Sequence, residues 1–398
     1  MTVPSLEIRK HCLRIGKAFF PGVLLLIDAV SASASDVEPP TFWKRIEEKG
    51  IYERIWEKFT FYENEENDVM QSLFLVGRYQ GQFWSVNAGH ESASGWENRR
   101  VFVGAEAELF HQITLQVQIK VSEDFDPFYD GLYQALVEWS PSDSFSLTVG
   151  RLDFLFNGLE RSVSSTRIVT FERGLVVNQV IPGEFVGAVV EGNPGDYSYR
   201  AGVLSGSVGH EFTDFHGGVG AFAGAGCKLP LFYENGNLHL DYLFNDGNPS
   251  NNALEPYDHV VSLWHQGNAG PFGMGADLTW AHGLGDRPAA FGITLLPTYV
   301  IAKNLLRKED VLQAVLRYQF AASNKDNGLQ LQQRYEQEIM SGGAGDHYHA
   351  IYGGINYLIF GDRLKLMTGV EYSTMHDSAR DGGAFNGWTY FAGVRVFF

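Results

Sequence analysis

The chain has 398 residues and a formal net charge of -17, with 19% charged residues, 14% aromatic residues and 45 glycines. A chain this acidic, without a basic strip interleaved with aromatic residues, argues against nucleic-acid binding. It contains no run of about 18 apolar residues, which excludes a membrane-spanning helix, whereas a transmembrane β-barrel needs only alternate apolar residues.

The first 34 residues have the layout of a secretory signal peptide. Basic residues precede an apolar run at 18–27, and the small residues 32–34 follow it. This order predicts export with cleavage after Ala34, and an ordinary buried helix is the alternative. Cleavage would remove Cys12, one of the two cysteines, so no intrachain disulfide is expected.

Residues 35–71 are predicted to form a periplasmic segment with a short helical part. Its apolar residues recur at approximately helical spacing, with an interruption at Gly50, at Phe42, Ile46, Ile51, Ile55 and Phe59. The acidic run 63–68 is typical of a solvated linker.

From residue 72 to the end, apolar and polar residues alternate with the period of two that a half-buried strand has. In 113–121, for example, Ile113, Leu115 and Val117 alternate with polar residues. We predict an all-β fold, a sixteen-stranded antiparallel transmembrane β-barrel spanning 72–398. The predicted strands lie at 72–86, 97–110, 112–122, 131–140, 144–156, 184–192, 196–206, 216–229, 237–246, 258–268, 272–282, 290–303, 310–322, 347–361, 364–376 and 388–398.

The connections between these strands alternate in length. Tight links such as 140–143 and 361–363 fall between longer ones such as 87–96, 123–130 and 323–346. Outer-membrane barrels have short turns on the periplasmic side and long loops outside, whereas a soluble β-sandwich need not sort its loops in this way. An even strand count places both ends of the chain on one side of the membrane, so we expect Phe398 to close the barrel against the first strand.

Five short segments carry a resemblance to a known family. They are WENRR at 96–100, GRLD at 150–153, GLER at 158–161, SSTR at 164–167 and TFER at 170–173. With these segments the chain resembles the phosphate-selective porins of the porin O and porin P family. The likeness extends over most of the chain and is specific across roughly 96–190.

The resemblance implies a homotrimeric outer-membrane porin that works by passive diffusion of small inorganic anions, phosphate or other oxyanions among them. It also implies an inward-folded third external loop that forms a constriction. The residues that match the family's anion-binding positions are Arg78, Arg99 and Arg100 on the wall and Arg161, Ser164 and Arg173 on the loop. The family often has lysine where this chain has Arg161, so anion transport is implied more directly than phosphate transport.

The residues themselves favour the same interpretation of the loop. Residues 157–183 form one of the longest connections and carry Arg161, Arg167 and Arg173. A sixteen-stranded barrel is wide enough for an aqueous channel, so selectivity requires a narrowing. Clusters of arginine select anions at such a constriction, because guanidinium groups suit oxyanions.

Strand parity predicts which basic residues face the lumen. Arg78, Arg100, Lys120 and Arg317 share the parity of polar neighbours such as glutamine and are expected inside. Arg99 falls on the lipid parity, where it would require a bulge, a rim position or a subunit contact. Arg151 has the same problem and is expected at the rim or a trimer interface, while Arg395 is expected to brace the barrel wall through a salt bridge.

Other functions find little support in the sequence. An enzyme would need an activated nucleophile beside a base, and no such arrangement is evident, so neither catalysis nor a cofactor is expected. His347 and His349 form the one close histidine pair, which could bind metal weakly but more often marks a loop end. The net charge of -17 keeps open a weakly selective general-diffusion or cation-preferring porin as the alternative.

Overall fold

The computed structural model describes residues 51–398 except for 210, 214–215, 231–232, 234, 332–333 and 341–343. The predicted signal peptide, 1–34, and residues 35–50 of the predicted periplasmic segment lie outside the described residues. None of the helices in the described part of the chain has the length and hydropathy that a membrane span requires.

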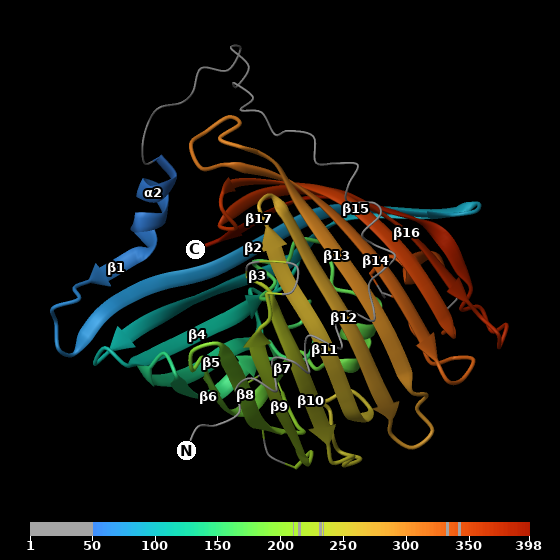
Figure 1. The fold of residues 1–398 in the computed structure, drawn as a ribbon, viewed down its shortest axis with the longest axis horizontal. Coiled ribbons are helices and arrows are strands. Elements are labelled where there is room, and N and C mark those ends of the chain that lie inside the picture. The colour runs from blue at the N-terminus through green and yellow to red at the C-terminus, as the bar shows by residue number, and fades with distance from the viewer. Residues whose placement is uncertain are drawn as a thin grey trace.

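Sixteen antiparallel strands of the described chain, β2 to β17, form a closed barrel (Figure 1). Each strand pairs with the next along the chain, and β17 pairs with β2 from Trp388↔Asn87 to Phe397↔Arg78. The predicted all-β fold is therefore confirmed. The strands are β2 Met70–Ala88, β3 Glu91–Leu109, β4 Ile113–Val121, β5 Tyr129–Ser142, β6 Phe145–Asp153, β7 Glu184–Gly192, β8 Tyr197–Ser205, β9 Val219–Lys228, β10 Asn237–Asn245, β11 Tyr257–Ala269, β12 Phe272–Gly283, β13 Ala290–Lys303, β14 Val311–Ser323, β15 His347–Phe360, β16 Leu364–His376 and β17 Phe385–Phe397.

One predicted long connection, 87–96, is wrong. Strands β2 and β3 continue through most of it and meet in a tight turn at residues 89–90, where Gly89 has a φ of 62°. The polar residues Ser92 and Ser94 resembled a loop in sequence, but they pair with Asn87 and Ser85 of β2. Backbone pairing therefore extends β3 across a stretch that lacks an apolar face.

A short additional strand, β1 Thr60–Glu63, was not predicted. It pairs with β2 from Thr60↔Phe74 to Glu63↔Ser72, on the edge of β2 that β17 leaves open beyond Arg78. The acidic run 63–68 makes the turn between β1 and β2, so it is a hairpin connection and not an extended linker.

The N-terminal helical part covers the barrel end that carries the short turns. It consists of α2 Ile51–Trp56 and the 3-10 turn η2 Glu57–Phe59, and it lies beside the C-terminus (Figure 1). The Trp56 indole N–H donates to the Phe397 carbonyl at 2.8 Å, and the Phe59 and Phe398 rings stack with centroids 3.9 Å apart. Phe398 also exchanges two backbone hydrogen bonds with Gly77 of β2, which confirms the predicted closure.

The strand faces differ as the alternation predicts. Leu316 and Ile351 are more than half exposed on the outside, whereas Arg317 and Tyr352, their neighbours along the strands, are almost fully buried inside. An exposed apolar outer surface is what a barrel presents to lipid. We call the end with the longer connections external, because outer-membrane barrels carry their longer loops outside.

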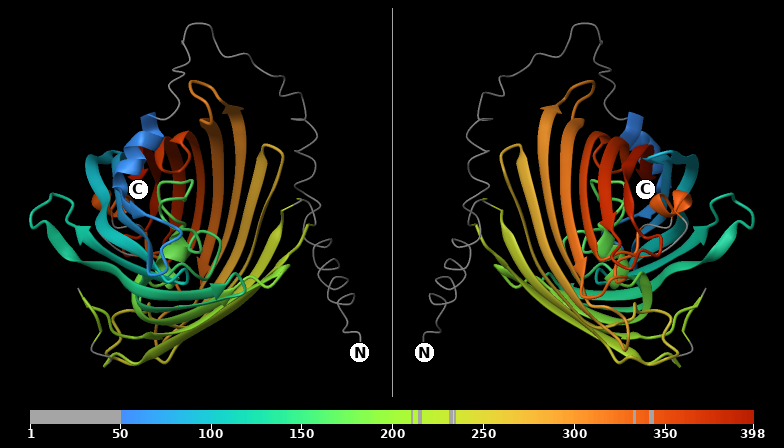
Figure 2. Two further views of the ribbon diagram at one scale, coloured as in Figure 1. Left: turned by 90° about the vertical axis from the view of Figure 1, so that its left-hand side faces the viewer. Right: turned by 90° about the vertical axis from the view of Figure 1, so that its right-hand side faces the viewer.

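The main buried apolar cluster inside the barrel includes residues of every strand from β6 to β17. The connection between β6 and β7, residues 154–183, folds into the ring of strands (Figure 2, green) and is called the inward loop below. Its helix α3 Leu175–Val180 and its residues Phe154 and Phe156 share a buried cluster with inward residues of β9 to β15, such as Phe222 and Val260. Helix α3 contacts β12, β13 and β14, so this side of the lumen is filled with side chains.

Candidate functional site

Buried basic residues of the wall hold the inward loop in place. Arg317 of β14 binds the Glu160 carboxylate at 2.7 Å and the Glu172 carbonyl at 2.6 Å, and it also pairs with Glu371 of β16 at 2.8 Å. Because both carboxylates are also buried, this three-residue network fixes the loop to the wall in a single orientation.

Two further wall cations bind loop carbonyl groups. Arg395 donates to the carbonyls of Ser165 at 3.3 Å and Phe171 at 2.6 Å, and Lys365 donates to the Ile168 carbonyl at 3.1 Å. The prediction that Arg395 braces the barrel wall through a salt bridge is therefore wrong. Its described hydrogen bonds hold the inward loop through carbonyls, and they are not a salt bridge within the wall.

The inward loop separates two cavities. One of about 490 Å³ lies on the external side, between the loop and the wall of β3 to β5. The other, of about 500 Å³, lies between the loop and the short-turn end of β10 to β13, and Glu160 and Arg167 of the loop line it together with Asn235 and Gln266. The loop therefore lies between the two cavities and lines both of them.

Charged residues dominate the lining of the external cavity. Six are basic, namely Arg99, Arg100, Lys120, Arg161, Arg173 and Arg334, and five are acidic, namely Glu123, Asp130, Asp153, Glu184 and Glu255. Four of the six residues predicted from the sequence as an anion site are among them. The cavity thus carries a balanced to slightly positive set of charges, although the whole chain is strongly acidic.

A β-bulge resolves the predicted conflict at Arg99. Gln80 of β2 pairs with Arg100 and Gly81 pairs with Asn98, so Arg99 is the extra residue of β3 at this point. An extra residue lets two successive side chains point to the same face. Of the three expected explanations the bulge is the observed one, and both Arg99 and Arg100 line the cavity.

Arg99 and Arg100 share one carboxylate of the inward loop. Arg99 binds Glu172 at 2.7 and 3.1 Å, and Arg100 lies 3.9 Å from Glu172 while donating to the Gln80 side-chain oxygen at 2.9 Å. Burial raises the pKa of Glu172, but the two guanidinium charges outweigh burial and hold this pKa well below its ordinary value. The group of three residues therefore keeps a net positive charge.

Arg161 and Arg173 lie on the loop side of the same cavity. Arg161 pairs with Asp153 at 2.7 Å and donates to the carbonyls of Pro182 and Gly183. Arg173 donates to the carbonyls of Glu160 and Val163 at 2.9 and 2.7 Å. Burial lowers the pKa of Arg173 to about 10, and the neighbouring Arg161 charge adds to this lowering, so Arg173 stays charged at neutral pH.

The other two predicted residues, Arg78 and Ser164, lie next to the cavity without lining it. Arg78 donates to the hydroxyl of Ser165 at 2.6 Å and to that of Ser164 at 3.5 Å, and its guanidinium lies over the rings of Phe102 and Tyr133. Ser165 lines the cavity, so Arg78 contacts a cavity-lining residue without lining the cavity itself.

A second external connection, 324–346, reaches into the lumen, and the sequence reasoning did not identify it. The Tyr335 hydroxyl bonds to the carboxylates of Glu97 and Glu172, and Arg334 pairs with Glu97 at 2.8 Å and Glu123 at 2.6 Å. The only feature of the sequence that pointed to this connection was its length, and length alone does not show whether a loop folds into the barrel.

Arg151, which was also on the lipid parity, is buried near the external rim. Its guanidinium donates to the carbonyls of Gly209 and Glu211 in the connection between β8 and β9. This agrees with the expected rim position.

Comparison with known proteins agrees with this geometry. The model of the family described as phosphate-selective porin O and P matches residues 76–239, which include the inward loop and both arginine groups. The predicted resemblance to this family is confirmed. No curated protein matches the chain.

Several solved outer-membrane proteins share the fold. Salmonella typhi OmpF in complex with daunomycin has 12% identity and a TM-score of 0.56, with 85% of this chain and 100% of that chain covered. Vibrio cholerae OmpT lacking loop L8 has 12% identity and a TM-score of 0.55, with 82% and 99% covered. Pseudomonas putida OprB at high pH has 12% identity and a TM-score of 0.54, with 82% and 94% covered. The family match and the barrel together support an outer-membrane channel and point away from an enzyme.

Proposed function

We propose that this protein is an outer-membrane porin through which small inorganic anions diffuse passively. The observation that carries the proposal is the convergence of Arg99 and Arg100 of the wall with Arg161 and Arg173 of the inward loop on one cavity. Arg78 and Ser164 belong to the proposed site indirectly, through Ser165.

The charges explain how such a site would favour anions. A narrow passage with few water molecules has a low effective dielectric constant, so an anion that has lost part of its hydration gains more from each guanidinium group than it would in bulk water. Several weak sites in series also allow the ion to leave again. Arginine donors fit the oxygens of phosphate and other oxyanions, which agrees with the description of the matching family.

A weakly selective or cation-preferring pore is the second candidate, because five carboxylates line the same cavity. Lys120 pairs with Glu184 at 2.9 Å and Arg161 pairs with Asp153, so part of the positive charge is neutralised locally. The two candidates differ in the sign of the ion selectivity.

The reversal potential across a planar bilayer under a KCl gradient distinguishes them. We expect the wild-type channel to prefer chloride and the Arg100→Gln variant to move partway toward zero, because it loses one charge but keeps a hydrogen-bonding side chain. Lys228→Gln, an exposed charge change at the short-turn end, serves as the matched control and should leave the potential unchanged. Cation preference in the wild type would overturn the anion proposal in favour of the second candidate.

We also propose that the protein is exported by cleavage of residues 1–34. The mature chain then consists of a periplasmic segment at 35–71 and the barrel domain 72–398, and it assembles into a homotrimer in the lipid of the bacterial outer membrane. The basic and apolar order of the N-terminus supports cleavage, and one structure of similar fold, in-vitro folded Vibrio cholerae OmpT, is described as a trimer form. The intact mass of the membrane-extracted protein tests the cleavage, since a mature chain that retains Met1 would contradict it. Chemical cross-linking tests the homotrimer, since the appearance of monomer bands alone would contradict it.

A further inference from the structure

Two groups of the same composition lie at the external rim of the barrel. In each group, an aspartate and a histidine lie at the start of one strand, and a second histidine lies at the end of the next strand. Asp258 and His259 of β11 face His282 of β12, and Asp346 and His347 at β15 face His376 of β16. In both groups the two histidines are cross-strand partners. The sequence pair His347 and His349 is therefore not the relevant one, because the partner of His347 comes from the neighbouring strand.

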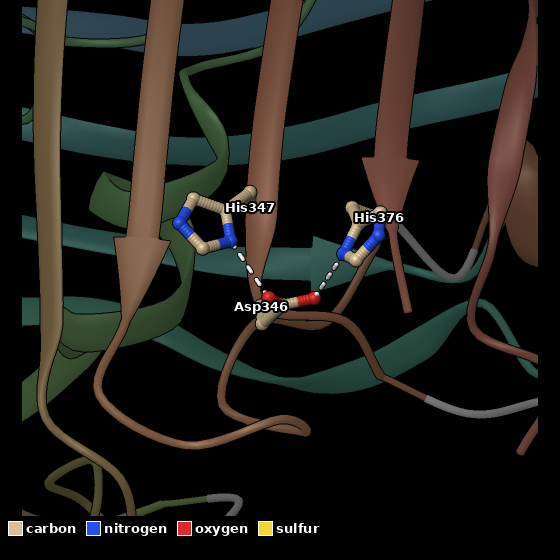
Figure 3. Close-up of side chains that lie close together, drawn as sticks. All are labelled: Asp346, His347 and His376. Atoms are coloured by element: carbon tan, nitrogen blue, oxygen red, sulfur yellow. Dashed lines mark hydrogen bonds and ion pairs between the residues drawn. The ribbon is translucent and has the colours of Figure 1, made fainter. Parts of the chain in front are cut away.

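The second group is the more convergent of the two (Figure 3). The His347 Nδ1 and the His376 Nδ1 each lie against a different oxygen of the Asp346 carboxylate, at 2.7 and 3.0 Å. One potential ligand atom from each of the three residues can be chosen so that all lie within 4.8 Å of one another. The imidazoles are 53% and 69% exposed, so an ion could reach them from solution.

The aspartate of this group is held rigidly. Its backbone N–H donates to the His376 carbonyl and its carbonyl accepts from Ser323, so its main chain bridges the ends of β14 and β16. Ser378 donates its backbone N–H and its hydroxyl to the carboxylate at 3.2 and 3.1 Å.

We propose that Asp346, His347 and His376 form a binding site for a divalent transition-metal ion, with Zn²⁺ as the ion best matched. Neutral imidazole and carboxylate are ligands that Zn²⁺ commonly takes, and a tetrahedral ion with three protein ligands keeps one position for water. In the Nε2–H tautomer each imidazole can bind the ion through the lone pair of Nδ1. Binding of the ion would then take the place of the two hydrogen bonds between the Nδ1 atoms and the Asp346 carboxylate.

The group of Asp258, His259 and His282 serves as a control, because only one of its histidines contacts the aspartate closely. His259 binds the Tyr242 hydroxyl through Nδ1 at 2.7 Å, and its Nε2 is 3.8 Å from Asp258. Only His282 makes a short contact with Asp258, at 2.7 Å. Its histidines therefore converge less on the carboxylate than those of the second group do.

The alternative is that Asp346 only fastens the strand ends together by hydrogen bonds. Such a role would make substitution destabilising, but it would give no saturable response to zinc. A bound ion would join the start of β15 to the end of β16 and should therefore raise the thermal stability of the wild type, because it binds the folded protein.

Zinc titration of the full-length protein, without a histidine tag, after treatment with a chelator, tests the proposal. Isothermal titration calorimetry should give one saturable site in the wild type, weakened roughly tenfold or more in the His347→Gln/His376→Gln variant. The His259→Gln/His282→Gln variant should retain that site. Circular dichroism establishes that both variants fold. The zinc-dependent rise in melting temperature should disappear in the His347→Gln/His376→Gln variant and persist in the His259→Gln/His282→Gln variant. An absence of saturable zinc binding in the wild type, or equal affinities in the wild type and the His347→Gln/His376→Gln variant, would overturn the proposal.

Discussion

At the scale of single residues, the arginines of the lumen have two distinct roles. Arg317 and Arg395 are almost fully buried and bind groups of the inward loop, so they set its position. Arg99 and Arg100 line the external cavity and share a single carboxylate, so they contribute positive charge to the proposed anion site. Burial and the identity of the partner, not residue type, separate the two roles.

The anchoring role of Arg317 leads to a stability prediction. In the Arg317→Met variant the buried carboxylates of Glu160 and Glu371 lose their shared cation, and leaving buried charge unpaired costs about 3–5 kcal/mol. Lys228→Met, which breaks an exposed pair with Asp196, should cost about 0–1 kcal/mol. Chemical unfolding in lipid vesicles measures both, and equal losses in the two variants would contradict the anchoring role.

The sequence identified some of these residues and not others. Strand parity placed Arg78, Arg100, Lys120 and Arg317 inside and recognised that Arg99 required an exception, because side-chain direction in a strand is a local property. It could not assign Glu172 to Arg99 or Asp153 to Arg161. Those pairs depend on how a loop of irregular structure folds back on the wall, which no local period encodes.

At the scale of elements, the strands were predictable and the path of the loops was not. The period of two located all sixteen barrel strands, with boundaries displaced most where polar residues pair, as in β3. The inward course of 154–183 was implied by family resemblance, whereas that of 324–346 was missed. Both courses depend on contacts between residues far apart in sequence, such as Tyr335 with Glu97.

The connection 324–346 gives a pH prediction. Glu336 begins the 3-10 turn η3 Glu336–Ile339 and is buried beside Glu371, Arg317 and Thr389. Burial, together with the Glu371 charge, raises the pKa of Glu336 from its ordinary value of 4.5 to about 8. The docked connection therefore binds the proton more tightly than a connection displaced into solvent, so docking is strongest below pH 4.5 and weakens as the pH rises toward 8.

We expect wild-type conductance to increase as the pH is raised through this range, because the connection leaves the lumen more often. The Glu336→Gln variant, which stays neutral, should lose most of this dependence. Single-channel recording at several pH values measures it. Conductance that changes equally with pH in both proteins would assign the effect to another group.

At the scale of the whole molecule, the barrel is filled asymmetrically. The apolar face of α3 occupies the side of β12 to β14, and the external cavity lies against β3 to β5. The net charge of -17 therefore says little about the local field at the constriction, since fields of exposed charges are screened beyond roughly 10 Å at moderate salt. Selectivity is expected to follow the residues that line the cavity.

The central claim is that ions pass between the inward loop and the wall of β3 to β5. It is tested most directly by thiol modification of single channels that carry one introduced cysteine, in a background without Cys12 and Cys227. Lys120→Cys lines the external cavity, and the control Thr279→Cys is buried on β12, on the side that α3 covers. A bulky methanethiosulfonate reagent should sharply reduce the conductance of the Lys120→Cys channel and leave the Thr279→Cys channel unchanged. Unchanged conductance at position 120, or a block at position 279, would contradict the account.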